Sequence, residues 1–270
     1  MPEPVVAERT AVRSERRGDV LVLTLARPDK GNALRQQDIE AVIAEIESVR
    51  ADPSARSIVL RAEGKHFCAG ADLQTANKVD RKPTIGHVAR ALETGPHRMI
   101  DALWNCPVPI VSAVQGRAMG LGLHLAVVCD FVIAAPDARF SEPFSRRGFS
   151  ADSGGTFLLP KLIGIRRARQ MLLRGIDVDA ATARDWGLID DVIEDGALDD
   201  AAFALAAELA SGPTFSLGHT KQLLNRRAPV DMSSALLGEA DSVEATIRSV
   251  DFKEGIRAFA ERRDPVFVGY

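Results

Sequence analysis

The pattern of apolar residues predicts short buried strands separated by helices. Continuous apolar runs, typical of buried strands, occupy residues 20–25, 57–60, 109–114 and 131–134. Isoleucine and valine recur at helical spacing over residues 36–50, which predicts an amphipathic helix, and a further helix is expected to begin near Gly120. This alternation indicates an α/β fold. Because several strands come in pairs before a helix, a regular doubly wound sheet is not expected.

The pattern changes in the C-terminal part of the chain. Helices are predicted over residues 166–174, 180–186, 199–211, 217–225 and 233–248, and no strand is expected after about residue 200. We therefore predict two regions, a core of residues 1–200 that carries the site and a helical region of residues 201–270. The helical region is expected to pack on the core or on a neighbouring subunit, with a hinge at Gly212-Pro213.

Composition and charge limit the partners that can be expected. The 270 residues carry a formal net charge of −3, with 46% hydrophobic and 26% charged residues. These values are typical of a globular protein and give no reason to expect nucleic acid or an anionic membrane as a partner. The N-terminus has no apolar signal segment, and His124 and Asp130 interrupt the longest apolar stretch, so we expect a cytoplasmic protein.

The cysteines favour neither a disulfide framework nor a metal site. Cys68, Cys106 and Cys129 are odd in number and show no CxxC spacing. They are expected to be small buried residues in a reducing compartment. No metal is expected.

Two glycine-containing turns are the candidate chemical features. FCAGADL covers residues 67–73, and AMGLGLH covers residues 118–124. Glycine lets backbone N–H groups approach a ligand, and a helix N-terminus favours negative charge. If the turns face each other, one N–H from each could hold a single oxygen as an oxyanion hole. The alternative is two tight turns with structural glycines.

These motifs and their order resemble the enoyl-CoA hydratase/isomerase (crotonase) superfamily. FCAGADL is followed by MGLGLHLAVVCD, ARFSEPF and SGGTFLLPKLIG, and the similarity runs from LARPDKGNAL at residues 25–34 to PVF at 265–267. The resemblance implies a crotonase-like spiral of ββα repeats and a C-terminal helical region used for trimerisation. It also implies acyl-CoA thioester substrates, a homotrimer or a dimer of trimers, and no cofactor beyond the coenzyme A of the substrate.

The resemblance assigns roles to particular positions. The N–H groups of Ala69 and Leu121 would hold the thioester oxygen. The positions expected to contact coenzyme A or the acyl group are Lys30, Ala33, Gly70, Ala71, Asp72, Leu73, Gly120 and Phe144. Five basic residues are further candidates for the CoA phosphates, unless they are simply solvated charges: Arg35, Lys253, Arg257, Arg262 and Arg263.

Two positions depart from the hydratase pattern. Hydratases of the family carry two glutamates that activate water, and here the matching residues are His124 and Phe144. Because hydration needs paired acid and base groups, ordinary hydratase chemistry is not expected.

Asp152 is the candidate carboxylate in place of these glutamates. Its local pattern alone favours a helix N-cap. The segment also resembles the pattern FSxxGxxxDxGGTxLLP of the 1,2-epoxyphenylacetyl-CoA isomerase group. This resemblance favours a role for Asp152 as a general base.

Two other side chains leave alternatives open. His124 could face the acyl pocket as a hydrogen-bond donor or second acid/base, or be a neutral histidine bonded to a backbone carbonyl. Glu142 could share a face with Phe144, although a solvated rim carboxylate is favoured. His66 is expected to be structural or exposed.

Three functions follow from this pattern. The first is an acyl-CoA isomerase that shifts a double bond or rearranges a ring epoxide through an enolate. The second is a hydratase with substitute groups, such as His124 with Asp152 or Glu142. The third is an acyl-CoA binding protein without catalysis.

Overall fold

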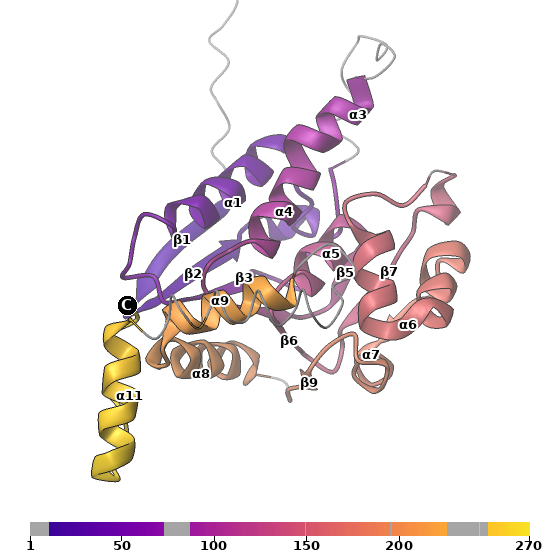
Figure 1. Ribbon diagram of the computed structural model, residues 1–270. Helices are drawn as coiled ribbons and strands as arrows, with labels where there is room; N and C mark the ends of the chain where they lie inside the picture. Colours follow the sequence, from indigo (N-terminus) through magenta and orange to yellow (C-terminus); the bar gives the residue numbers. More distant parts are fainter. Residues whose placement is uncertain (1–10, 73–86, 149, 195, 226–242, 244–247) are drawn as a thin grey trace, which may run out of the picture.

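The computed structural model describes residues 11–72, 87–148, 150–194, 196–225, 243 and 248–270. Leu73 and nearly all of the predicted helix 233–248 lie outside the described residues. Two sheets and the helices around them form the body of the protein (Figure 1).

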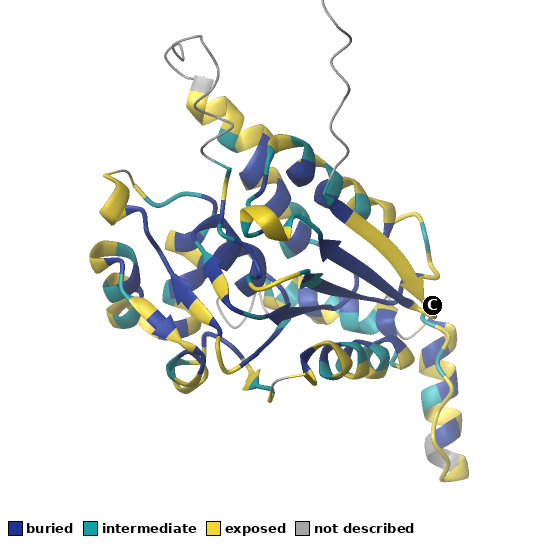
Figure 2. Ribbon diagram, turned by 180° about the vertical axis from the view of Figure 1, so that it is seen from behind, coloured by how far each residue is buried: buried dark blue, intermediate teal, exposed yellow. Residues whose placement is uncertain are grey.

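The larger sheet has six strands in the order β1-β2-β3-β4-β6-β9, with β1 antiparallel and the others parallel. Its strands are β1 (Val12–Arg17), β2 (Val20–Leu25), β3 (Ser57–Ala62), β4 (Ile110–Val114), β6 (Phe131–Ala134) and β9 (Asp191–Val192). The four predicted strands are confirmed as β2, β3, β4 and β6. The prediction missed β1, because five of its six residues are exposed at the sheet edge (Figure 2).

A smaller sheet lies beside the first and carries the turns of interest. Its strands are β5 (Arg117–Met119), β7 (Arg139–Ser141) and β8 (Asp177–Asp179). Cys68 extends it by a parallel bridge to Ala118. The chain thus passes repeatedly from the large sheet to the small sheet and then into a helix, as β4–β5–α5 and β6–β7–α6. This is the predicted spiral of ββα repeats.

Helices cover both faces of the large sheet. The helices of the chain are α1 (Gln36–Ser48), α3 (His87–Leu92), α4 (Arg98–Trp104), α5 (Leu121–Val127), α6 (Gly155–Arg174), α7 (Ala180–Trp186), α8 (Leu198–Ser211), α9 (Thr214–Leu224) and α11 (Val250–Glu261). Short helical turns are η1 (Pro28–Lys30), η2 (Glu93–His97) and η3 (Ser145–Arg147). One core cluster joins the sheet to α1, α4, α5 and α6, and a second joins its other face to α8.

The C-terminal region is helical, as expected, and the division placed at residue 200 falls inside α8. Ala202, Ala206 and Ala210 of α8 pack on the large sheet. Further along, α11 extends away from the body (Figure 1). The chain end after α11 turns back, and Arg56 donates a 3.0 Å hydrogen bond to the carbonyl oxygen of Phe267. Arg56 therefore links the chain end to the start of β3.

Candidate active site

The two glycine-containing turns lie against each other, which is the condition for a shared oxyanion hole. The N–H of Met119 donates to the carbonyl oxygen of Cys68 at 3.0 Å. A Cβ on Gly70, whose φ is +99°, would lie 2.8 Å from the oxygen of Met119, and one on Gly122 would lie 2.2 Å from the oxygen of Cys68. Only glycine permits these two approaches.

The hydrogen bonds of the first turn correct one prediction. The N–H of Ala69 donates to the oxygen of Gly31 at 2.9 Å, so it cannot also hold a ligand. The N–H of Gly70 faces the sulfur of Cys68 at 3.4 Å. Among the described residues, the N–H of Ala71 has no hydrogen-bond partner. The prediction for Ala69 is therefore wrong, and the free donor of this turn belongs to Ala71.

The second turn leaves the predicted donor free. Leu121 is the first residue of α5, and Gly120 before it has a φ of +52°. A first-turn N–H has no partner within its own helix, and that of Leu121 finds none elsewhere in the described part of the chain. Ala71 and Leu121 line the same pocket. Two residues with free N–H groups therefore line one space.

This pocket is narrow and brings Asp152 to the same space. Its cavity volume is about 60 Å³, and the two turns, Leu92, Pro96, Phe144 and Asp152 line it. The half-buried Asp152 side chain has no hydrogen-bond partner among the described residues. Among the described residues that line the pocket, Asp152 is the only carboxylic acid.

The N-cap alternative for Asp152 is wrong. Helix α6 begins at Gly155, and the capping position is Gly154, with a φ of +90° and no side-chain cap. Asp152 contributes only its backbone oxygen, which accepts a 3.2 Å hydrogen bond from the N–H of Gly155. Its carboxylate is thus left for the pocket.

His124 and Glu142 form a buried pair behind the pocket wall. His124 Nε2 lies 2.6 Å from Glu142 Oε1, and both side chains are 0% exposed. The ring of Phe144 stacks on that of His124, with centroids 6.0 Å apart and planes 13° apart. Phe144 lines the pocket, whereas His124 and Glu142 do not. The aromatic ring therefore separates this pair from the ligand space.

This arrangement corrects the expectations for both residues. Glu142 is not a solvated rim carboxylate, because it follows β7 directly and points into the interior toward α5. His124 does not face the pocket, and its partner is a carboxylate rather than a backbone carbonyl. A buried charge or polar group requires such a partner. A Cβ on Gly155 would lie 2.3 Å from His124 Nε2, so the start of α6 packs directly on the pair.

The other positions assigned to coenzyme A are more dispersed. Gly70, Ala71, Gly120 and Phe144 line the pocket. Asp72 is held by an ion pair with Arg27 at 2.7 Å. Lys30 and Ala33 flank Gly31 and Asn32 on a neighbouring turn, and they line none of the described pockets.

Several of the basic candidates have partners within the chain. Arg35 pairs with Asp38 at 2.9 Å. Arg257 and Arg263 both pair with Glu254, and these hydrogen bonds hold the pKa of that carboxyl well below its usual range. Lys253 and Arg262 are exposed. A role for any of them toward CoA phosphates stays a prediction.

His66 and the cysteines have structural environments. Nδ1 of His66 accepts a 3.3 Å hydrogen bond from the N–H of Arg117, and burial together with Lys65 and Arg117 lowers its pKa. The three cysteines are free and buried, and burial raises the pKa of the Cys68 thiol to about 12. The prediction that the cysteines are small buried residues is confirmed.

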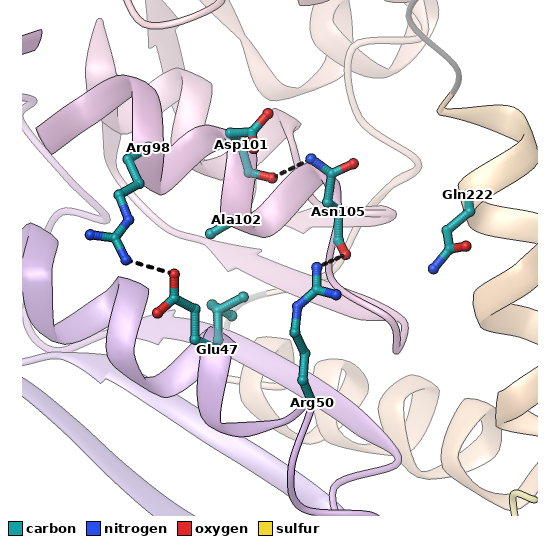
Figure 3. A pocket seen from close by; sticks show the side chains of 8 residues that line it. Glu47, Arg50, Arg98, Asp101, Ala102, Asn105 and Gln222 are labelled. Atoms are coloured by element: carbon teal, nitrogen blue, oxygen red, sulfur yellow. Dashed lines mark hydrogen bonds and ion pairs between the residues drawn. The ribbon is translucent and has the colours of Figure 1, made fainter. Parts of the chain in front are cut away.

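A polar groove lies away from this site, between α1, α4 and α9 (Figure 3). Glu47 and Arg98 form an ion pair at 2.9 Å across it. Arg50 donates to the oxygen of Asn105 at 2.7 Å. The groove contains none of the residues predicted for the site.

The described residues contain neither a metal-binding cluster nor a membrane-spanning helix. No group of three or more His, Cys, Asp or Glu side chains there is placed to hold a metal ion. No helix in that part of the chain is long and apolar enough to span a membrane.

The sequence prediction missed two features of the pocket. One is the free N–H of Ala71, which lies two residues from the predicted donor. The parallel bridge between Leu34 and Ala71 is made by the carbonyl oxygen of Gly70 and the N–H of Asp72, which both bond to Leu34. The N–H of Ala71 takes no part in it. The other is Ser153, which lines the pocket beside Asp152. Its position between an aspartate and two glycines was the only local signal.

Comparison with known proteins shows similarity to one family over nearly the whole chain. A family model described as enoyl-CoA hydratase/isomerase matches residues 15–269. The chain is 38% identical over 251 residues to the 1,2-epoxyphenylacetyl-CoA isomerase of Escherichia coli strain K12, covering 93% of this chain and 95% of that protein. It is 32% identical over 250 residues to the 2,3-dehydroadipyl-CoA hydratase of the same strain, covering 93% and 95%.

Solved structures show the same similarity over nearly the whole chain. The crystal structure of an enoyl-CoA hydratase from Polaromonas sp. JS666 superposes with a TM-score of 0.88 at 32% identity. The match covers 95% of this chain and 99% of that one.

Proposed function

Because the chain belongs to the enoyl-CoA hydratase/isomerase family, we propose that it is an acyl-CoA thioester isomerase that uses Asp152 as its general base. The observation that carries this proposal is that Asp152 lines one narrow pocket together with Ala71 and Leu121, whose N–H groups are free. A carboxylate can remove a proton from carbon only if the resulting charge is stabilised nearby.

The proposed reaction moves one proton and one double bond. The Asp152 carboxylate removes a proton from a carbon of the acyl chain. The electron pair of the broken C–H bond shifts toward the thioester, whose oxygen takes the negative charge and accepts hydrogen bonds from Ala71 and Leu121. Asp152 then returns the proton to another carbon of the delocalised anion, so the double bond moves and the atoms balance. Fixed backbone donors of this kind stabilise an oxyanion by about 3 kcal/mol each.

Phe144 supports isomerisation over hydration. Its ring lies between the pocket and the His124–Glu142 pair, so this acid/base pair does not meet the ligand space. Addition of water needs a second acid or base beside Asp152. A ring-epoxide thioester belongs among the test substrates, because the isomerase relative carries that substrate in its name.

Hydration is the second candidate. The buried pair lies directly behind Phe144, and some relatives are named as hydratases. A displacement of the Phe144 ring would open the pocket toward His124. Under this alternative, crotonyl-CoA is hydrated and His124→Ala abolishes the reaction. If the protein bound acyl-CoA tightly and turned over no thioester, it would instead be a binding protein.

The decisive experiment compares 3-enoyl-CoA, 2-enoyl-CoA and a ring-epoxide thioester as substrates. We expect isomerisation of at least one, and a loss of about a hundredfold or more in kcat for Asp152→Asn, as is typical on removal of a general base. Isomerisation is followed by the absorbance of the conjugated thioester, and mass spectrometry detects hydration, which adds the mass of one water, whereas isomerisation leaves the mass unchanged. Asp185→Asn, on the exposed surface of α7, is the matched control. Full isomerase activity in Asp152→Asn would refute the assignment.

A further inference from the structure

The buried His124–Glu142 pair lies where the elements that carry the proposed catalytic groups meet. His124 belongs to α5, whose first residue, Leu121, has one of the two free N–H groups. Glu142 directly follows β7. Gly155 is the first residue of α6, and Asp152 lies three residues before it. The oxyanion donor and the general base are therefore both carried by segments that contact this pair.

The contact between the pair and the start of α6 is close. A Cβ on Gly155 would lie 2.3 Å from His124 Nε2 and 3.3 Å from Glu142 Oε1, so there is no room for a side chain between them. The N–H of Gly155 in turn donates to the backbone oxygen of Asp152 at 3.2 Å. A movement of the pair would therefore reach Asp152 through a single residue.

The pair also supports the aromatic wall of the pocket. The ring of Phe144 stacks on that of His124, with centroids 6.0 Å apart. The same ring lies close to the second glycine turn, because a Cβ on Gly120 would be 3.4 Å from Cζ of Phe144. The N–H of Gly120 donates to the oxygen of Ser141 at 2.9 Å, which ties this turn to β7. The position of the Phe144 ring therefore depends on the imidazole and on the turn together.

Stability alone does not account for the pair. Nδ1 of His124 and Oε2 of Glu142 are buried and have no hydrogen-bond partner among the described residues. Each unsatisfied atom of this kind costs about 1–3 kcal/mol. Apolar residues of similar volume often replace a buried charged or polar pair without loss of stability. A pair that costs free energy, and that lies where functional segments meet, indicates a role in holding those segments in place.

We infer that His124 and Glu142 are positioning residues for the isomerisation, an inference that rests on the proposed function. Their 2.6 Å hydrogen bond fixes the start of α6 relative to α5, and with it Asp152 relative to the N–H of Leu121. Neither side chain of the pair lines the pocket. Because a misplacement of about 1 Å can lower a rate about a hundredfold, loss of the pair acts on the chemical step rather than on binding.

The first test separates kcat from KM, with the thioester that the wild-type protein isomerises fastest. Glu142→Leu removes the hydrogen bond to His124, and kcat is expected to fall about ten- to a hundredfold with KM nearly unchanged. Glu142→Gln keeps an oxygen that accepts from Nε2, and it is expected to recover most of the kcat. A raised KM with an unchanged kcat, or a Glu142→Gln variant as impaired as Glu142→Leu, overturns the inference.

Two further variants separate positioning from a general loss of stability. Lys221→Ala breaks another buried pair, with Asp130, and Lys221 lines none of the described pockets, so its kcat is expected to be that of the wild type. His124→Leu/Glu142→Leu removes both polar groups, and it is expected to fold and to lose as much kcat as Glu142→Leu. Circular dichroism confirms that each variant is folded at the assay temperature. An equal kcat loss in Lys221→Ala, or full kcat in the double variant, overturns the inference.

A structural measurement separates this inference from the proposed function. If the wild-type protein isomerises no thioester, the proposed function fails, and the positions of Asp152 and Phe144 still test the role of the pair. Crystal structures are expected to show one of these side chains displaced by about 1 Å or more in Glu142→Leu, and both in their wild-type positions in Glu142→Gln. Unchanged positions in Glu142→Leu overturn the inference.

Discussion

At the scale of single residues, a few contacts decide the chemistry of the pocket. The hydrogen bond from Ala69 to Gly31 removes one N–H from use and leaves that of Ala71 free. The ring of Phe144 separates a histidine–glutamate pair from the ligand space. The second effect depends on a side chain, so a single substitution at Phe144 tests it.

The His124–Glu142 pair gives a prediction at this scale. Glu142→Leu leaves His124 Nε2 without a partner in a site that is 0% exposed. We expect the free energy of unfolding to fall by about 3 kcal/mol, because breaking a buried pair leaves the other group uncompensated. Urea titration followed by circular dichroism measures it.

The double variant His124→Leu/Glu142→Leu is the control for this prediction. It removes both polar groups, and we expect it to be less destabilised than the sum of the two single variants. Additive losses would show that the two side chains are not coupled.

At the scale of elements, buried polar contacts attach the C-terminal helices to the spiral. Lys221 of α9 is buried and pairs with Asp130, just before β6, at 2.7 Å. It also donates to the oxygen of Val108 at 3.2 Å. Gly218 of the same helix approaches Pro107, where a Cβ would lie 2.2 Å from the carbonyl oxygen. Helix α9 is therefore seated closely against the segment before β4.

We predict that Lys221→Ala destabilises this attachment. The substitution leaves Asp130 with an unpaired, partly buried carboxylate, and the free energy of unfolding is expected to fall by about 3 kcal/mol. Thermal and urea unfolding measure the loss. Arg169→Ala, on the exposed side of α6, is the control and is expected to change stability by less than about 0.5 kcal/mol. A similar loss in both variants would contradict a specific role for Lys221.

At the scale of the whole molecule, α11 is the most prominent feature, because it extends from the body and carries exposed apolar side chains (Figure 1). Val250, Phe252 and Ile256 are 49%, 40% and 57% exposed. Large exposed apolar surfaces are typical of protein interfaces. Helix α11 therefore offers apolar surface to a partner, and the homotrimer or dimer of trimers stays a prediction.

We expect sedimentation velocity to show a trimer or a hexamer at micromolar concentration. Phe252→Glu/Ile256→Glu places two charges on the exposed apolar face and should shift the protein toward the monomer. Lys253→Glu, an exposed position of the same helix, changes charge without removing apolar surface. A monomeric wild-type protein, or dissociation caused equally by Lys253→Glu, would contradict an apolar α11 interface.

The local sequence determined much of the fold. Continuous apolar runs identified β2, β3, β4 and β6, and helical spacing identified α1, because burial imposes a period on neighbouring residues. The polar sequence of β1 shows no such period, and the structure places it at the sheet edge, where one apolar residue is enough. The order of the motifs was likewise sufficient to indicate the family.

The tertiary structure decided which groups can act. The sequence placed both glycine turns and Asp152 in the site, but whether an N–H is free depends on acceptors that distant segments supply, as Gly31 does for Ala69. The burial of Glu142 beside His124 and the unpartnered hydroxyl of Ser153 arise in the same way, from packing between α5, the end of β7 and the start of α6. A hydrogen bond has two partners, and local sequence specifies only one of them.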